Sequence, residues 1–541
     1  MKSVLEGNVA ALAGVQRDLA HRIAREQPSD ALTPVTTRDG QPGFAASGRA
    51  LHSRYDPRRE ATRLIDSSVP EGTATVVILG VGGGFTTRAV IDSRPGTTVV
   101  ALERSPGTLA AILARIDLSP QIRSGRIRFC VDPELLTPIL QDVHLPLMRS
   151  GIRTINLPQW TELPENRDFF RTCRGMIQEV TRYLIEQAIT IRRFARPWLV
   201  HSVHNSHSMG SEGEFFSRLH GIGKALSDKT VFVAAAGPGL DSFLDQPAER
   251  ARLRTAPLFA VDTALPALLS RGITTEAVVS LDPQPWSVMH MRGRISAETV
   301  LFADLGVAPS LARRSEEAGT VWFAGTHPLH QLLYAHGAPC LLLPESPDSV
   351  TEAAVLLARG LGAARVELIG ADGGYPGART YAGGTAHYSL AARAASRLSP
   401  QAHFFARQVY PSMVQEERKG GSPFFTSPAM GERAGRIRQA LSSSPRIHWP
   451  RHSSGERFDP VQFWRRHLME LDNVASRLRS SPAEALPDTT ALRNVLGPHG
   501  VAHVPLLARM QREQSRRFIP GLEAVLREIQ GFIFTENSRY S

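Results

Sequence analysis

The sequence lacks the features that mark several common protein classes. Its 541 residues include only three cysteines, Cys130, Cys173 and Cys340, and no CxxC pair. Neither a disulfide framework nor a zinc site of the usual spacing is therefore expected. No apolar run approaches the length of a membrane span, and the short apolar stretch from Val9 to Val15 is a poor signal peptide. We expect a cytoplasmic protein with reduced thiols and no membrane partner.

The chain also lacks a phosphate-binding P-loop. Gly223-Lys224 looks like the end of such a loop, but position 218 is Arg218 instead of glycine and Ala225 follows the lysine. The formal net charge of +11 favours anionic partners. Because the arginines are spread along the chain and not gathered into one run, we expect a solvated basic surface or an anionic small-molecule substrate, and no nucleic acid.

The chain is long enough for two or three domains, because a single core rarely extends over so many residues. Apolar runs alternate with helical patterns, which predicts an α/β fold. We predict a Rossmann-like N-terminal domain at residues 1–228, a doubly wound central α/β domain at 229–411 and a helical C-terminal domain at 412–541, without convincing strands after Pro411. The strands of the central domain are predicted near Val231, Phe259, Val278, Leu301, Trp322, Cys340 and Leu368.

Three motifs follow one another at the start of the central domain. An apolar strand pattern at 230–236 leads into Gly237-Pro238-Gly239 and a helical pattern. Two further apolar strands each end on an aspartate, in Asp262-Thr263 and Asp282-Pro283-Gln284. In a parallel sheet the ligand sits beyond the carboxyl ends of the strands, which is where these motifs are predicted to lie.

The glycine loop has the composition of an anion site. Gly237 and Gly239 have no Cβ, so backbone can approach a ligand closely, and Pro238 suits the first turn of a helix. The free N–H groups at a helix start favour a phosphate. An ordinary strand-to-helix turn explains the loop alone equally well, but aspartates at two neighbouring strand ends make a chance arrangement less plausible.

As an ordered set, these motifs closely resemble the central domain of the motility accessory factor (Maf) proteins. The quoted segments are 235–241, 260–266 and 279–284. Maf proteins are bacterial glycosyltransferases that attach nonulosonic acids to flagellin, and the same domain family includes an archaeal 6-hydroxymethylpterin diphosphokinase. The resemblance implies transfer of a nonulosonic, sialic-acid-like sugar from its CMP donor to Ser or Thr of flagellin, in support of flagellum assembly and motility.

The resemblance also implies roles for particular residues. Ser349 and Thr351 lie in a turn like the serine-rich turn that the family places beside the nucleotide, although helix capping explains Ser349 fully. Asp372 follows the strand at 366–370 in a family-like turn. The implied catalytic residues are Asp282, Asp372 and His387. The implied substrate-binding residues are Gly237, Pro238, Gly239, Asp262, Thr263, Gln284, Ser349 and Thr351.

Two departures from familiar patterns bear on the chemistry. Where the family has a segment with lysine and histidine, this chain has 379–385 and then His387, so His327 is a second candidate for the base. No two aspartates are separated by one residue, so the Asp-x-Asp metal clamp of many sugar-nucleotide transferases is missing. We expect no obligatory cofactor or metal, as in one similar bacterial sialyltransferase class, with Mg²⁺ as an option.

A second glycine loop lies in the N-terminal domain. The segment 80–84 follows a strand pattern, and Glu103 ends the next strand. Phe85 replaces the third glycine of GxGxxG, and the arrangement resembles the nucleoside-binding start of methyltransferases. Maf proteins carry a similar loop, so we interpret this domain as degenerate or auxiliary. The preceding His52 and Arg54 are predicted to form a structural clamp.

Three alternative functions stay open at this point. A pterin-type diphosphokinase would share the central domain, and a methyltransferase would bind S-adenosylmethionine at the N-terminal loop. The third alternative is a non-catalytic adaptor whose helical C-terminus binds flagellin. His201, His204 and His207 have a spacing at which metal binding is conceivable, but a polar helix end explains them better.

Overall fold

The computed structural model describes most of the chain in two compact units. The described residues are 3–71, 73–94, 97–143, 150–291, 295–314, 319–410, 415–419, 422–450, 458–480, 496–504 and 518–540. The first unit comprises Met1–Ala195 and Leu471–Glu528, and the second comprises Arg196–Glu470 and Ile529–Ser541. The predicted domain borders at 228/229 and 411/412 stay predictions.

The first unit contains a parallel sheet of four strands in the order β6-β5-β4-β7. Their bounds are β4 Thr73–Leu79, β5 Thr98–Leu102, β6 Ile127–Cys130 and β7 Ser150–Asn156. Every residue of β4 is buried, because a strand covered on both faces needs a continuous apolar run. Its helices are α1 Val4–Ala13, α2 Arg17–Arg25, α3 Pro57–Ser68, α4 Phe85–Ser93, α5 Pro106–Leu113, α6 Ser119–Arg123, α7 Leu136–Val143 and α8 Pro158–Thr161.

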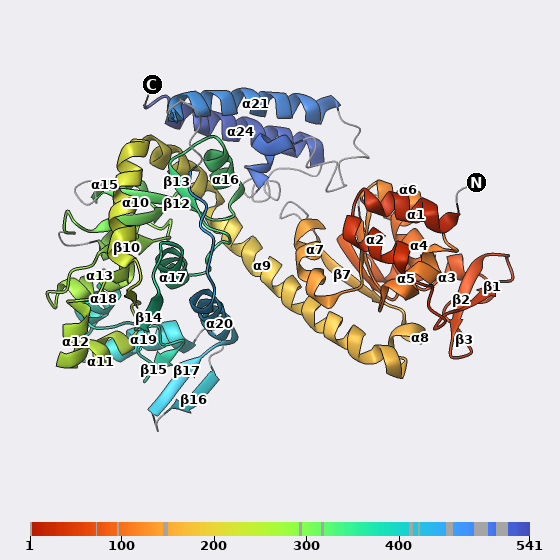
Figure 1. Cartoon of the computed structure of the whole chain (residues 1–541), viewed down its shortest axis with the longest axis horizontal. Coiled ribbons are helices and arrows are strands. Elements are labelled where there is room, and N and C mark those ends of the chain that lie inside the picture. The colour runs from red at the N-terminus through yellow and green to blue at the C-terminus, as the bar shows by residue number, and fades with distance from the viewer. Residues whose placement is uncertain are drawn as a thin grey trace. The chain divides into compact units, whose positions relative to one another are not determined.

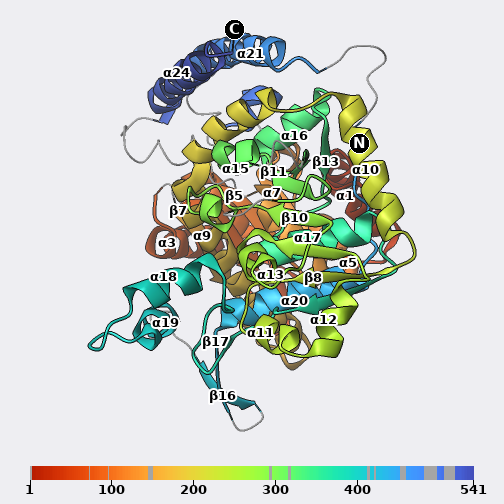
Figure 2. The ribbon, with the colours of Figure 1, turned by 90° about the vertical axis from the view of Figure 1, so that its left-hand side faces the viewer.

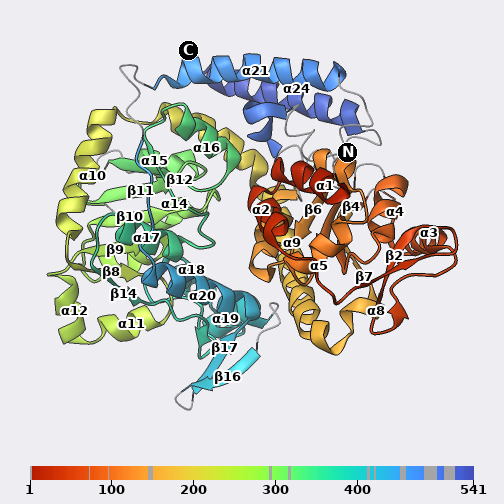
Figure 3. The same ribbon diagram turned by 45° about the vertical axis from the view of Figure 1, so that its right-hand side comes forward.

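A small antiparallel sheet precedes this parallel sheet. It consists of β1 Thr33–Thr36, β2 Pro42–Ala46 and β3 Arg49–Ala50, and it lies near α3 at the edge of the first unit (Figure 3). The hairpin follows from the turn residues between its strands. The three cysteines of the chain are buried and free.

The second unit contains a parallel sheet of seven strands in the order β13-β12-β11-β10-β9-β8-β14. All seven predicted strands are confirmed. Their bounds are β8 Thr230–Ala234, β9 Leu258–Val261, β10 Ala277–Ser280, β11 Val300–Asp304, β12 Thr320–Ala324, β13 Cys340–Leu342 and β14 Arg365–Ile369. The strand order reverses at β8, which has β9 on one side and β14 on the other, so the carboxyl ends of β8 and β14 form a topological switch point.

Helices cover both faces of this sheet, which confirms the α/β fold class (Figure 1). One apolar cluster joins alternate strand residues such as Val231, Val233 and Phe302 to one helical layer, and another joins Phe232 and Ala234 to the opposite layer. The first layer contains α10 Glu212–Leu226, α17 Val350–Gly360 and α20 Pro428–Ser442. The second contains α11 Gly239–Leu244, α12 Pro247–Leu253 and α13 Leu265–Leu269.

The remaining helices of the second unit lie in the loops that follow its strands. They are α14 Ser287–His290, α15 Pro309–Arg314, α16 Pro328–Ala335, α18 Ala386–Ala394 and α19 Gln401–Val409.

A second, three-stranded sheet follows the parallel one and corrects the expectation of a purely helical C-terminal part. It has the order β15-β17-β16, with β15 Tyr375–Pro376, β16 Gln415–Lys419 and β17 Ser422–Thr426, and it lies below α19 and α20 in Figure 1. The two strands after Pro411 were missed because the sequence of β16, QEERK, has no apolar alternation.

Long helices complete the fold: α9 Pro164–His207, α21 Pro460–Ser480 and α24 Phe518–Asn537. Near the end of α9, His204 bonds to Tyr540 at 2.6 Å and to Glu536 at 2.8 Å, and His207 bonds to Asn537 at 3.0 Å. The histidines of α9 therefore form a polar helix end, as predicted. None of the described helices combines the length and apolar character that a membrane span needs.

Candidate active site at the carboxyl edge of the central sheet

The glycine loop after β8 meets Asp372 of the loop after β14. The Gly239 N–H donates to both carboxylate oxygens of Asp372 at 3.1 Å. A Cβ at Gly237 would meet Asp372 Oδ2, so Gly237 and Gly239 make room for this carboxylate. We expected free N–H groups here; Asp372 accepts that of Gly239, and α11 has only six residues. The loop therefore has fewer free backbone N–H groups for binding an external anion than the sequence predicted.

The first aspartate of the site is Asp262, which follows β9 and is almost fully buried. Its Oδ2 accepts the Ser280 hydroxyl at 2.7 Å, and its Oδ1 accepts the Thr263 N–H at 2.6 Å and the Thr263 hydroxyl at 3.0 Å. Burial raises the pKa of Asp262, although these hydrogen bonds and the nearby His387 lower it. Ser280 ends β10, so Asp262 joins two neighbouring strand ends.

The second aspartate, Asp282, lies beyond the end of β10 and is partly exposed. It accepts the backbone N–H of Gln284 at 2.9 Å and its side-chain amide at 3.3 Å. Burial raises the pKa of Asp282, and the neighbouring Asp262 carboxylate raises it further. Gln284 therefore orients Asp282.

Two histidine rings and a tyrosine ring complete the cluster. The rings of His290 in α14 and His387 in the first turn of α18 have centroids 5.0 Å apart, and Tyr381 stacks on His387 at 4.4 Å. Burial lowers the pKa of His387 and the His290 ring lowers it further, whereas Asp262 and Asp282 act in the opposite direction. The structure thus brings the predicted residues Asp262, Asp282 and His387 into one group.

His290 and Tyr381 were not predicted as site residues. His290 is 6% exposed, and its Nδ1 has no hydrogen-bond partner among the described residues. Burial lowers its pKa, while Asp282 raises it. The only sequence signal for His290 is its position eight residues after Asp282, on a helix too short to show a period. A buried, unpartnered ring nitrogen near the Asp282 carboxyl group marks a place where a ligand can bind.

Charged groups around Asp241, here called the latch, hold the loop that carries Tyr381 and leads to His387. Asp241 in α11 accepts hydrogen bonds from Arg271 at 2.9 Å and Arg379 at 2.7 Å. It also accepts the Gly383 N–H at 2.8 Å. Asp241 therefore fixes the loop after β15 to the first helix of the sheet and positions both rings of the cluster.

Ser349 and Thr351 lie at the start of α17. The Ser349 hydroxyl accepts the Glu352 N–H at 3.1 Å, so Ser349 caps the helix. Glu352 in turn binds Arg436 of α20 at 2.9 Å. No described contact links Ser349 or Thr351 to the cluster, and their nucleotide-binding role stays a prediction.

His327, the second candidate for the base, belongs to a different, buried network. Burial lowers the pKa of His327 to about 4, and its ring packs against His330 at 4.6 Å. His330 Nε2 lies 3.0 Å from the Ser202 hydroxyl, and His330 Nδ1 lies 3.9 Å from the Asp304 carboxylate at the end of β11. The three groups are in serine–histidine–aspartate order, but all are buried, so we assign them a structural role.

The N-terminal glycine loop is filled by the chain itself. Glu103 is fully buried and accepts the Trp160 indole N–H at 2.7 Å and the Val81 N–H at 3.1 Å. His52 accepts the Gly83 N–H at 3.0 Å. Burial raises the pKa of Glu103. Because its oxygens are engaged inside the loop, Glu103 is not available to hold a ribose.

His52 also lines a cavity of about 280 Å³ between the small antiparallel sheet and the glycine loop, together with Arg54 and Phe85. A Cβ at Gly82 would lie 2.7 Å from His52 Nε2. The clamp predicted at His52 thus has a direct contact with the loop. Across the described part of the chain, no group of three or more His, Cys, Asp or Glu side chains is arranged to hold a metal ion.

Comparisons with known proteins agree with this architecture. Residues 201–378 match the family model described as 6-hydroxymethylpterin diphosphokinase MptE-like. Two proteins of Treponema pallidum (strain Nichols), both named only as uncharacterized, are similar: one is 26% identical over 40% of this chain and 72% of its own length, the other 31% identical over 25% and 37%. The second match thus spans little more than a third of that relative.

The fold of the whole chain also has a solved counterpart. It is similar to the structure of a Maf glycosyltransferase from Magnetospirillum magneticum AMB-1, with a TM-score of 0.56 and 13% identity over 99% of this chain and 96% of that one. The chain thus carries an MptE-like domain within a fold like that of a Maf glycosyltransferase, the family that its motifs predicted.

Proposed function

We propose that the protein is a glycosyltransferase that moves a nonulosonic sugar from its CMP donor to Ser or Thr of flagellin. The observation that carries the proposal is the group of Asp262, Asp282, His290, Tyr381 and His387 at the carboxyl edge of the central sheet. The fold likeness to a Maf glycosyltransferase supports the reaction class.

The two histidines suit the proton transfer that this reaction needs. Because burial lowers the pKa of both His290 and His387, both rings are neutral near pH 7 and able to accept a proton. His387 is partly exposed and is therefore proposed as the base that deprotonates the acceptor hydroxyl. His290, whose Nδ1 is unpartnered, is proposed to contact the donor.

The carboxyl groups are proposed to bind the sugar. Asp282, oriented by Gln284 and partly exposed, can accept hydrogen bonds from sugar or ribose hydroxyls. The buried Asp262 holds the side chains of Ser280 and Thr263 by hydrogen bonds next to this group. No metal is given a role, and transfer in the presence of EDTA is the direct check on that assignment.

The test is a transfer assay with purified protein, recombinant flagellin of the encoding organism and a CMP-nonulosonic acid. Intact-mass spectrometry should show added sugar mass on flagellin, and the Asp282→Asn variant should lose it. Matched circular dichroism spectra control for folding. Failure to modify flagellin with several CMP-nonulosonic donors would contradict the proposal.

The second candidate is a pterin-type diphosphokinase, which the description of the matched family model favours. That reaction transfers diphosphate from ATP to a hydroxymethylpterin and needs a divalent metal. Incubation with 6-hydroxymethyl-7,8-dihydropterin, ATP and Mg²⁺, followed by mass analysis, separates the two. AMP formation that depends on the pterin would support the diphosphokinase. If no such AMP forms, the glycosyltransferase remains the proposed function.

A further inference from the structure

The helix pair α18–α19 lies beside the candidate active site and presents several exposed basic side chains. From Gly373 to Gln415 the chain contains no Asp or Glu, whereas it contains four arginines. Arg379 is engaged by Asp241. The other three, Arg393, Arg397 and Arg407, are exposed, and no described carboxylate pairs with them. The exposed charged side chains of the two helices themselves are therefore all cationic, and the nearest acidic residues along the chain are Asp372 and Glu416.

Apolar side chains stand among these charges. Leu398, in the loop between α18 and α19, is 86% exposed, and Tyr410 at the end of α19 is 61% exposed. Leu398 lies next to the exposed Arg397, so this surface offers an apolar group and cationic groups side by side. The two helices lie next to each other at the periphery of the unit (Figure 2).

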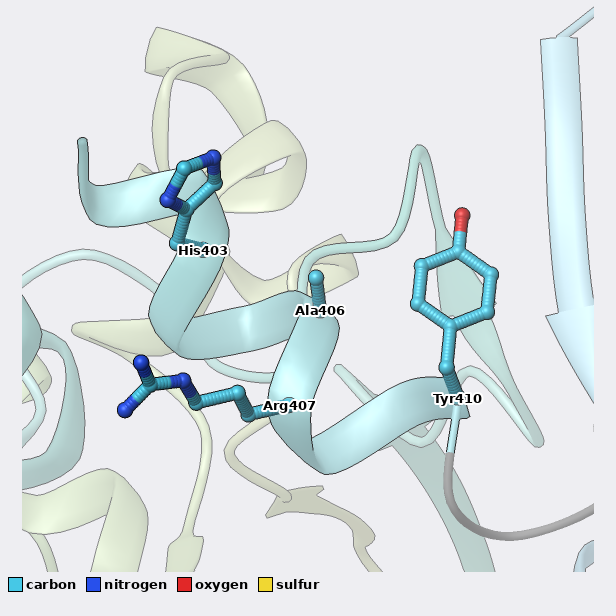
Figure 4. Close-up of a pocket in the computed structure, with 4 residues that line it drawn as sticks. All are labelled: His403, Ala406, Arg407 and Tyr410. Atoms are coloured by element: carbon cyan, nitrogen blue, oxygen red, sulfur yellow. The ribbon is translucent and has the colours of Figure 1, made fainter. Parts of the chain in front are cut away.

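The outer face of α19 carries a shallow depression that is largely open to solvent. The depression has a volume of about 360 Å³ and is lined by His403, Ala406, Arg407 and Tyr410, whose spacing of three and four residues puts them on one side of the helix (Figure 4). Ala406 is the small residue between the larger side chains. The depression can therefore receive an apolar side chain while Arg407 binds a carboxylate beside it.

This surface is coupled to the candidate active site. His387 lies in the first turn of α18. Gln408 of α19 accepts the hydroxyl of Thr380 at 2.8 Å, and Thr380 precedes the Tyr381 that stacks on His387. A partner bound to α18–α19 would therefore lie on the same elements that position the proposed base.

We infer that α18–α19 is the docking surface for the protein acceptor, which it binds through an acidic segment carrying an apolar side chain. The inference rests on the proposed function, because it names the surface by which that site selects its acceptor. We take the bound partner to be a polypeptide. A polypeptide can place an apolar side chain against Leu398 and the depression, and at the same time place carboxylates against the three arginines.

The experiment compares two double charge reversals. Arg393→Glu/Arg397→Glu changes the docking surface, and Arg59→Glu/Arg63→Glu is the matched control. Arg59 and Arg63 are also exposed, four residues apart on α3, and without an ion pair in the described structure. Both variants change the net charge equally, so a general charge effect would appear in both.

Binding of unmodified recombinant flagellin is measured by surface plasmon resonance without donor, and hydrolysis of CMP-N-acetylneuraminic acid and of other CMP-nonulosonic acids is measured without flagellin. We expect Arg393→Glu/Arg397→Glu to weaken flagellin binding at least about tenfold, and Leu398→Ser to weaken it less. The control should bind like the wild type, all variants should hydrolyse the donor equally, and added NaCl should weaken wild-type binding.

Equal binding by the charge-reversed variant and the control would overturn the inference. So would absence of flagellin binding with retained binding of phosphatidylglycerol vesicles or of an oligonucleotide, because the surface would then serve a lipid or a nucleic acid. Loss of flagellin binding in the variant, together with no transfer of sugar to flagellin by any of the proteins, would leave the docking surface in place and refute the transferase reaction.

Discussion

Two glycine loops in this chain follow a parallel strand and precede a helix, and each is followed by a strand that ends on an acid. In the first unit the acid is Glu103, in the second it is Asp262. Glu103 is covered by Trp160 and by the loop's own Val81 N–H. Asp262 is also buried, but it backs the partly exposed Asp282 and His387. The motif is the same, but the acid of the first edge is covered, whereas the second edge carries two partly exposed groups, Asp282 and His387, that can exchange protons with a ligand.

The comparison of the two loops shows that a glycine pattern alone does not identify a ligand-binding site. A glycine pattern reports only that backbone or a side chain approaches closely, and in both loops the approaching group belongs to the protein: His52 at Gly83, Asp372 at Gly239. The distinguishing feature is the set of side chains beyond the neighbouring strands. Predictions that perturb one edge at a time test this contrast.

The largest effect on transfer is expected from His387→Ala. Loss of the proposed base should lower the rate of sugar transfer by about 10²–10⁴-fold, the usual range for general base catalysis. The assay is the initial rate of flagellin modification at saturating donor. His220→Ala is the control, because His220 is exposed on α10 and bonds only to its own helix at Phe216. A His387→Ala enzyme with the wild-type rate would remove this side chain from the reaction.

Asp241→Asn should have the next largest effect. The change weakens three interactions of the latch, with Arg271, Arg379 and Gly383. Hydrogen bonds to charged groups contribute about 1.5–3 kcal/mol, so urea unfolding should show a loss of about that size, and transfer should fall because His387 is less well positioned. The neighbouring Asp245→Asn, in an exposed residue, is the control. Equal stability of the two variants would mean that the latch contributes little.

Much of this architecture was predictable from sequence, and the failures have physical causes. The seven central strands were predicted because buried parallel strands are continuous apolar runs. Asp262 and Asp282 could be placed near one edge because carboxyl ends of parallel strands meet there, whereas His387 was named from the resemblance to the family. The contact between Asp372 and Gly239 joins residues 133 positions apart, and His290 lies on a four-residue helix. No local pattern encodes either one.

The variant Asp304→Asn tests whether the acid at the end of β11 is a buried structural group, like Glu103, and not a partly exposed site residue, like Asp282. Burial raises the pKa of Asp304 from 3.8 to about 7, so the folded protein holds its proton longer than the unfolded chain. Unfolding free energy should therefore fall as pH rises from 3.8 to about 7, by up to about 1.4 kcal/mol per pH unit.

The asparagine removes this contribution. It keeps an oxygen for the Gly306 N–H, bonded at 2.7 Å, and turns an amide toward the unpartnered Nδ1 of His330. The difference in unfolding free energy between variant and wild type, measured by urea titration from pH 4 to about pH 7, should shift in favour of the variant as pH rises. A constant difference would show that Asp304 is ionised in the folded state.

Glu103→Gln should have the smallest effect on transfer, namely none, and for that reason it tests the contrast most directly. The glutamine cannot accept both the Trp160 and the Val81 N–H groups as well as the carboxylate does, so a stability loss of about 1 kcal/mol is expected. Because burial raises the pKa of Glu103, the wild-type contribution weakens as pH rises above its ordinary 4.5, and the variant should lack that pH dependence. Calorimetry with S-adenosylmethionine should show no binding by the wild type. If the wild type instead binds S-adenosylmethionine with measurable heat, and Glu103→Gln abolishes that heat, the first loop is a nucleoside site. Both sheet edges would then bind a ligand, and they would differ only in which ligand they bind.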